Sequence, residues 1–66
     1  MPVEPMTIQL HLVNLQSQER RCLLQTEVAT LEDLAKLISS QKSPNPGWFF
    51  HAVAPESPHF IRPELN

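Results

Sequence analysis

The sequence predicts a small α+β domain of β-β-α-β order, in which one helix covers one face of a three-stranded sheet. Two segments of alternating polarity, 7–14 and 20–28, are separated by a short polar stretch. A segment of helical periodicity, Thr30–Ser40, follows them. The apolar segment Trp48–Val53 comes after a connection that contains two prolines and the only glycine.

The 66 residues have room for one domain, and a domain of this size has a core that is marginal on its own. We expect an extended arm at 1–6, the β-β-α-β domain over 7–53 and a Pro-rich extended tail over 54–66. All seven prolines lie outside the predicted helix and strands, which favours stiff, extended ends. We expect the tail to pack Phe60 and Ile61 onto the domain or onto a partner.

The first two segments predict a β-hairpin. In the first strand, an apolar face alternates with a polar, solvent-facing one that holds Thr7, Gln9 and His11. In the second strand, we expect Leu23 to lie on the outer face. The inner face, which we expect the helix to cover, holds Cys22, Leu24, Thr26 and Val28. The stretch between them lacks the Asn-Gly or Asp-Gly of a tight turn, so we expect a loop of several residues.

The helix has the clearest local signals in the chain. Thr30 is suited to the N-cap, and Asp33, three residues later, can complete a capping box. The acidic residues of the first turn are favoured by the helix dipole. Apolar residues recur at the helical period on the side that we expect to cover the sheet, namely Leu31, Leu34, Ala35, Leu37 and Ile38.

The connection after the helix must be non-helical because it contains Pro44 and Pro46. We expect Gly47 to adopt a positive φ. A third strand over Trp48–Val53 runs parallel to the second strand and antiparallel to the first. The sheet order 2-1-3 lets the third strand pair with the first, and we predict that order.

The segments MTIQLHLV, RRCLLQTEV and ATLEDLAKLI resemble the opening half of the ubiquitin-like β-grasp fold, in which a hairpin is followed by a helix entered through a Thr or Ser cap. The resemblance covers Met6–Ser40. The chain departs from the family after Val53, where too few residues remain for its fourth and central strands. Carrier proteins of this family act through a C-terminal Gly-Gly, whereas this chain ends Glu64-Leu65-Asn66, so the resemblance does not imply carrier chemistry.

Composition excludes several classes of function. A net charge of −2 argues against a phosphate-binding surface, because duplex binders carry a basic patch. No apolar run reaches the 18 to 20 residues of a membrane span, and the N-terminus has no secretory pattern. Cys22 is the only cysteine, so no intrachain disulfide can form, and we expect a reducing, cytoplasmic location.

Few residues suggest chemistry, and we expect no catalytic site, metal or cofactor. His11 and His51 lie in strands that we expect to pair, where two histidines and a carboxylate can hold zinc. No close-spaced ligand motif supports zinc, and solvent-facing histidines are the favoured interpretation. Cys22 is expected to be a small core residue rather than a nucleophile.

The aromatic third strand suggests a function in binding. One short helix cannot cover both faces of a strand that carries Trp48 and Phe50 on one side and Phe49 and Val53 on the other. The uncovered side indicates a protein partner, or a second copy in a homodimer. We expect a non-catalytic interaction module, with a small nucleic-acid-associated regulator as the alternative. The candidate partner-binding residues are Leu23, Trp48, Phe49, Phe50, Val53, Phe60 and Ile61.

Overall fold

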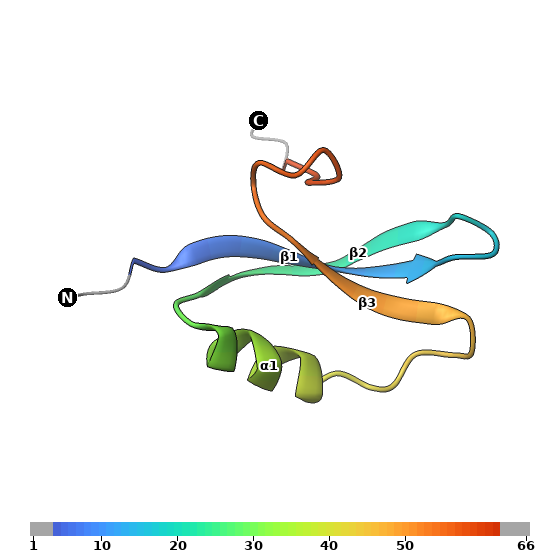
Figure 1. The fold of residues 1–66 in the computed structure, drawn as a ribbon, viewed down its shortest axis with the longest axis horizontal. Helices are drawn as coiled ribbons and strands as arrows, with labels where there is room; N and C mark the ends of the chain where they lie inside the picture. Colours follow the sequence, from blue (N-terminus) through green and yellow to red (C-terminus); the bar gives the residue numbers. More distant parts are fainter. Residues whose placement is uncertain (1–3, 63–66) are drawn as a thin grey trace.

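The computed structural model describes residues 4–62 and confirms the predicted α+β class. The chain forms strand β1 (Met6–Asn14), strand β2 (Arg20–Val28), helix α1 (Leu31–Ser39) and strand β3 (Trp48–Val53), in that order (Figure 1). The outer parts of the expected arm and tail, 1–3 and 63–66, lie outside the described residues.

The sheet has the predicted order β2-β1-β3, and β1 pairs antiparallel with both neighbours. As the central strand, β1 has a strand on each side: Leu10 lies between Leu24 of β2 and Ala52 of β3. Both faces of β1 are therefore shielded more than those of an edge strand. The buried hydrophobic residues of the described chain are Ile8, Leu10 and Val53.

A β-bulge in the hairpin changes which side chains share a face. Leu10 pairs with Leu24, but the next residue, His11, pairs with Cys22, so β2 holds one more residue than β1 at this point. The extra residue shifts the alternation of the strand. The prediction of an inward, core position for Cys22 is therefore wrong, since Cys22 is exposed beside His11. Leu23 is not on the outer face either, because it lies in a cleft with residues of the helix side.

The hairpin loop is the predicted loose connection. The Oδ1 atom of Asn14 accepts hydrogen bonds from the N–H groups of Gln16 at 2.9 Å and Ser17 at 3.0 Å. The N–H of Asn14 donates to the carbonyl of Glu19 at 2.9 Å. Gln18 has a φ of 62°, a left-handed conformation that closes the loop without a glycine.

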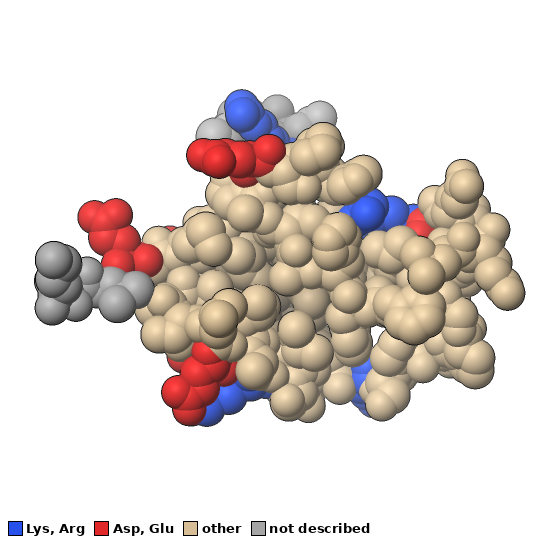
Figure 2. All heavy atoms as spheres, viewed as in Figure 1, with Lys and Arg blue, Asp and Glu red and all other residues tan. Residues whose placement is uncertain are grey.

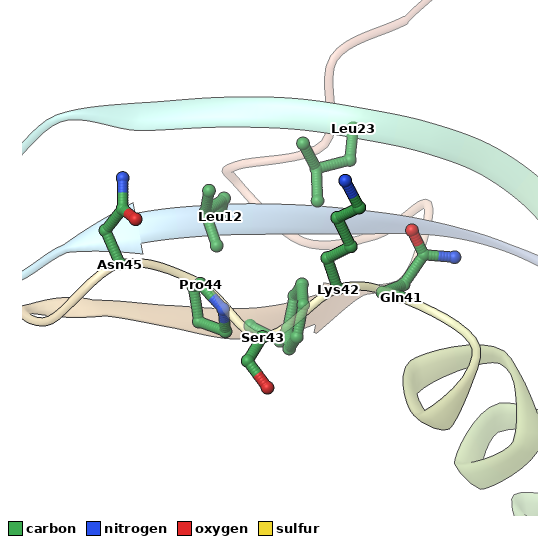
Figure 3. A pocket seen from close by; sticks show the side chains of 8 residues that line it. Leu12, Leu23, Gln41, Lys42, Ser43, Pro44 and Asn45 are labelled. Carbon is green, nitrogen blue, oxygen red and sulfur yellow. The ribbon is translucent and has the colours of Figure 1, made fainter.

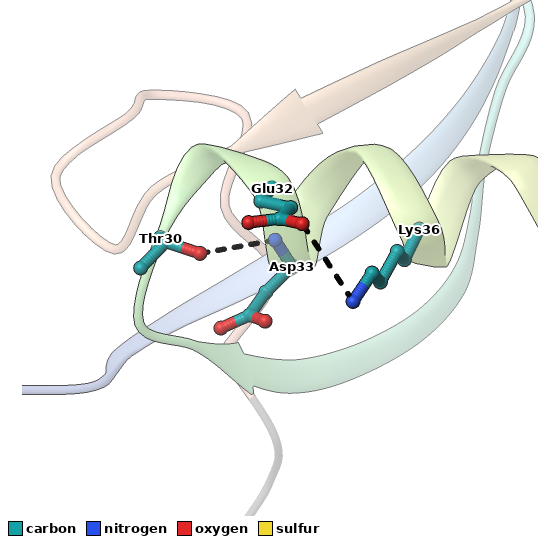
Figure 4. A network of polar contacts seen from close by, with 4 residues as sticks. All are labelled: Thr30, Glu32, Asp33 and Lys36. Atoms are coloured by element: carbon teal, nitrogen blue, oxygen red, sulfur yellow. Dashed lines mark hydrogen bonds and ion pairs between the residues drawn. The ribbon is translucent and has the colours of Figure 1, made fainter.

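The N-terminus of α1 has the predicted Thr30 N-cap, which is one half of the predicted capping box (Figure 4). The N–H of Asp33 donates to Oγ1 of Thr30 at 3.1 Å, and the Asp33 carboxylate accepts from the N–H of Ala29 at 3.1 Å. The carboxylate thus reaches the residue before the cap rather than the cap itself. Glu32 and Lys36 are 3.8 Å apart and exposed, so this ion pair contributes little to stability.

The helix covers the sheet less than the sequence predicts. Helix α1 packs mainly against β2, and none of its residues is buried (Figure 1). Leu31, at its first turn, is 85% exposed. A helix of nine residues is too short to screen the apolar face of three strands, so part of the predicted core remains accessible.

The tail turns back onto the sheet instead of staying extended. The carbonyl of Ala54 accepts from the N–H of Ser57 at 2.8 Å, and the carbonyl of Ser57 accepts from that of Phe60 at 3.0 Å. These two successive turns bring Ile61 beside β1, where it is bonded to Gln9. The contact is made by the backbone of Ile61, whose side chain remains about half exposed.

Gly47 has a φ of +92° in the turn before β3, as predicted. A Cβ atom here would meet Asn14 Nδ2 at 3.8 Å, an ordinary contact, so an added side chain is penalised by backbone strain alone.

We expect Gly47→Ala to lower the free energy of unfolding by about 1 to 2 kcal/mol, measured by urea denaturation. Ser43→Ala, in the same exposed connection, is the control and should change it by less than about 0.5 kcal/mol. Equal stabilities of the two variants would contradict the assignment of strain.

Candidate functional site

The face of the sheet opposite α1 contains a polar cluster, which we define as Gln9, His11, Arg20, Gln25 and His51. Of these five residues, Gln9 and His11 are buried, Arg20 is half-buried, and Gln25 and His51 are exposed. Gln9 is 2% exposed and His11 is fully buried, although both were expected to face solvent. That expectation is wrong because β1 is paired on both edges and because the tail covers this face at Ile61. The burial of Gln9 and His11 could have been anticipated from the predicted strand order, because that order makes β1 the central strand.

The Gln9 amide uses its full hydrogen-bonding capacity. Its Nε2 donates to Oε1 of Gln25 at 3.0 Å and to the carbonyl of Ile61. Its Oε1 accepts from the N–H of Ile61 at 3.0 Å and contacts Nε2 of His11 at 2.9 Å. A side chain thereby pairs with both backbone groups of Ile61, as a neighbouring strand does. Gln9 holds the tail against the sheet.

The hydrogen bonds of His11 define its tautomer. Nη1 of Arg20 lies 3.1 Å from Nδ1 of His11, and a guanidinium can only donate, so Nδ1 accepts. The proton therefore resides on Nε2, which donates to Gln9. The same Nη1 lies 3.4 Å from Nδ1 of His51, the cross-strand neighbour of His11. Arg20 thus joins β2 to a side chain on each of the other strands.

This arrangement favours the neutral imidazole. Burial lowers the pKa of His11 below its ordinary value of 6.5, and the positive charge of Arg20 and the nearby His51 and His59 act in the same direction. If Nδ1 of His11 were protonated, its N–H would point at the N–H donors of Arg20 and the hydrogen bond between them would be lost. Protonation of His11 is therefore expected to disrupt the polar cluster.

Two clefts lie on the helix side of the sheet. Sheet residues Leu12, Leu23 and Phe50 form one wall of the first, and the connection after α1 forms the other (Figure 3). The second lies between α1 and the start of the hairpin, lined mainly by apolar side chains such as Ile8, Val28 and Leu34. We define the helix-side surface as six of the exposed or half-buried apolar residues that line these clefts: Met6, Leu12, Leu23, Leu31, Leu34 and Phe50.

The candidate partner-binding residues divide between the two faces. The cross-strand partners of β3 confirm the predicted alternation: Phe50 pairs with Leu12 on the helix side, and Phe49 with Val13 on the other. Leu23 and Phe50 share a cleft on the helix side. Trp48, also on the helix side, lies under the guanidinium of Arg21, 5.8 Å from the ring centre. The structure therefore does not join all the candidates into one patch.

Of the three further candidates, Val53 and Ile61 lie on the face opposite α1, and Phe60 precedes Ile61 in the tail. Val53 is 3% exposed and belongs to the core, so it is not accessible to a partner. Ile61 is about half exposed although its backbone is bonded to Gln9, and Phe60 is half-buried.

Metal-binding chemistry has limited support in the described chain. His11 and His51 are cross-strand neighbours, as expected. Residues 4–62 nevertheless contain no group of three His, Cys, Asp or Glu side chains that could hold a metal ion. In the same part of the chain, no helix has the length and apolar character needed to span a membrane.

On the face of the molecule drawn in Figure 2, the charged residues do not form a basic stripe. Lys and Arg side chains occupy separate positions on it, and several lie next to acidic groups. Much of this face is uncharged. The distribution differs from the continuous positive surface that binding to a nucleic-acid backbone requires.

We expect Gln9→Leu to destabilise the fold strongly, because it leaves Nε2–H of His11 and the backbone of Ile61 without their partner. An unsatisfied buried polar group costs about 1 to 3 kcal/mol, so the free energy of unfolding should fall by roughly 2 to 5 kcal/mol. The control Gln25→Leu removes an exposed partner of the same amide and should cost less than about 1 kcal/mol. Amide hydrogen exchange at Ile61 should accelerate in Gln9→Leu. Unchanged exchange at Ile61 would show that Gln9 does not hold the tail.

We also expect the stability of the domain to decrease as the pH falls below about 6.5. In that range the unfolded chain protonates His11 before the folded chain does, so the unfolded state binds more protons and the free energy of unfolding drops. The measurement is chemical denaturation from pH 8 to pH 5 for the natural chain and for His11→Gln. The natural chain should lose more stability than the variant. Parallel curves would contradict a role for His11 in this dependence.

No family model, curated protein or solved structure matches the chain. These comparisons do not confirm the resemblance to the β-grasp fold; the structure shows only the order of the first elements and the antiparallel pairing of β1 with β2. Function must be inferred from the geometry of the surface and of the polar cluster.

Proposed function

We propose that the protein is a non-catalytic interaction module, which acts as a homodimer or as a small subunit or adaptor of a larger assembly. The observation that carries this proposal is the incomplete burial of the amphipathic helix. All nine residues of α1 retain solvent exposure, and the apolar side chains of its sheet-facing side meet the sheet only in part.

The helix-side surface has the composition of a binding site. It combines aliphatic side chains with an aromatic ring and is hollowed by two clefts. Met6, Leu23 and Leu31 are each more than 40% exposed. Exposed apolar side chains grouped in this way often mark a protein interface, and apolar anchors in clefts are preferred contact points.

The polar cluster supports a structural rather than a catalytic role. Both nitrogens of His11 are engaged, one with Gln9 and one with Arg20. A general base needs a free acceptor near a substrate, and here the acceptor faces a guanidinium. The exposed free thiol of Cys22 is consistent with a reducing, cytoplasmic location. The scattered basic residues do not favour the alternative of a nucleic-acid-associated regulator.

We expect the purified protein to associate, or to be poorly stable when it is alone. The measurement is its absolute mass by light scattering over a concentration series, with a thermal melt at each concentration. A dimer should have twice the 7.5 kDa of one chain and a melting temperature that rises with concentration. If a partner is missing instead, the monomer should melt early or aggregate. A stable monomer whose mass and melting temperature are independent of concentration would contradict the proposal.

A further inference from the structure

The two edges of the sheet differ in how they are protected. Strand β2 forms one edge, and it carries Arg20, Arg21 and Glu27, contains the bulge and packs against α1. Charged side chains, bulges and covering helices are the features by which natural sheets prevent pairing with another strand. The β2 edge is therefore unsuited to adding a further strand.

Strand β3, at the other edge, has none of these features. Its sequence WFFHAV contains no Asp, Glu, Lys, Arg or Pro, and its register with β1 is regular. Alternate residues of an antiparallel strand direct N–H and C=O away from the neighbour. In the described part of the chain, residues 49–53 make no backbone hydrogen bonds apart from those of the sheet, where β1 is their neighbour. This edge can accept another strand.

We infer that β3 pairs antiparallel with β3 of a second copy, so that two chains form one six-stranded sheet across a twofold axis. The inference rests on the proposed function, since it names the partner of the interaction module. A twofold axis brings the same sequence together with itself, and like charges directly opposite each other are destabilising. Because β3 carries no Asp, Glu, Lys or Arg, it can oppose itself without this penalty.

A register centred on Phe50 gives the best complementarity of side chains. It places Phe50 opposite Phe50 of the partner subunit, and Phe49 opposite His51 of the partner subunit. Trp48, the largest side chain, then faces Ala52 of the partner subunit, the smallest in the strand. Cross-strand aromatic pairs of this kind stabilise antiparallel sheets.

The pairing has a consequence for the helix-side surface. Residues directly opposite each other in a sheet project to the same face, so Phe50 remains on the helix side in both copies. The two helix-side surfaces then lie on the same face of the six-stranded sheet. A dimer formed in this way presents them side by side, and a larger partner can contact both.

Phe49 is the residue at which to test the edge. It is 54% exposed and pairs with Val13 of β1, so a polar substitution leaves the buried residues in place. In the proposed register it lies diagonally across from Phe49 of the partner subunit, within reach of a long side chain. We expect Phe49→Lys and Phe49→Glu each to raise the dissociation constant of the dimer at least about tenfold, measured by sedimentation equilibrium at pH 7.5. An equimolar mixture of the two should restore association.

Glu32→Gln, at an exposed position of α1 outside the helix-side surface, is the matched control and should leave the dimer intact. Leu31→Gln alters the helix-side surface and tests association through that surface; pairing through β3 predicts that the dimer persists in this variant. Circular dichroism melts verify that every variant is folded. In the natural chain, exchange of the β3 amides should slow as the protein concentration rises, whereas exchange in α1 should not.

The outcomes separate this inference from the proposed function. A dimer that persists in both Phe49 variants and dissociates in Leu31→Gln would overturn pairing through β3 and leave the interaction module in place. A natural chain that stays monomeric but melts early would do the same. A stable monomer at every concentration, with β3 exchange independent of concentration, would overturn both.

Discussion

The central strand has to accommodate polar side chains inside the sheet, and the rest of the structure depends on how it does so. Gln9 and His11 lie on the face of β1 where neither α1 nor solvent is available to them. Burying an amide or an imidazole is costly unless each polar atom finds a partner. The tail at Ile61, the Arg20 guanidinium and Gln25 supply those partners. A short chain thereby closes the second face of its sheet with a network of hydrogen bonds.

The small size of the chain also explains why the helix side of the sheet is incompletely covered. Within residues 4–62, one helix of nine residues is the only element of regular structure outside the sheet, and it packs mainly on β2. The small buried core, in which Ile8, Leu10 and Val53 are the hydrophobic residues, is consistent with the limited burial that 66 residues permit. Association through an exposed face or an open edge is a common way for a domain of this size to gain stability. This protein has an exposed face, the helix-side surface, and an open edge, strand β3.

Local sequence signals were sufficient where the cause of a conformation is itself local. The Thr30–Asp33 cap, the positive φ of Gly47 and the loose hairpin loop depend on nearby residues, and each was predicted correctly. The strand order was also predictable, because a β-α-β connection makes β3 parallel to β2 and leaves β1 as its antiparallel neighbour. The faces on which Cys22 and Leu23 lie could not be predicted, because a β-bulge depends on how two strands pair and not on either strand alone.

The sequence by itself therefore determined the elements, their order and the alternation of β3, because hydrophobic period, capping and backbone restrictions act over a few residues. The tertiary structure decided which faces are buried. It placed the polar side of β1 inside the domain, since the tail returns to Gln9 from 52 residues away in the chain. It also left α1 exposed, since the sequence period shows which side of a helix is apolar but not how much of that side another element covers. Burial is a property of the assembled layers, and only their arrangement could show it.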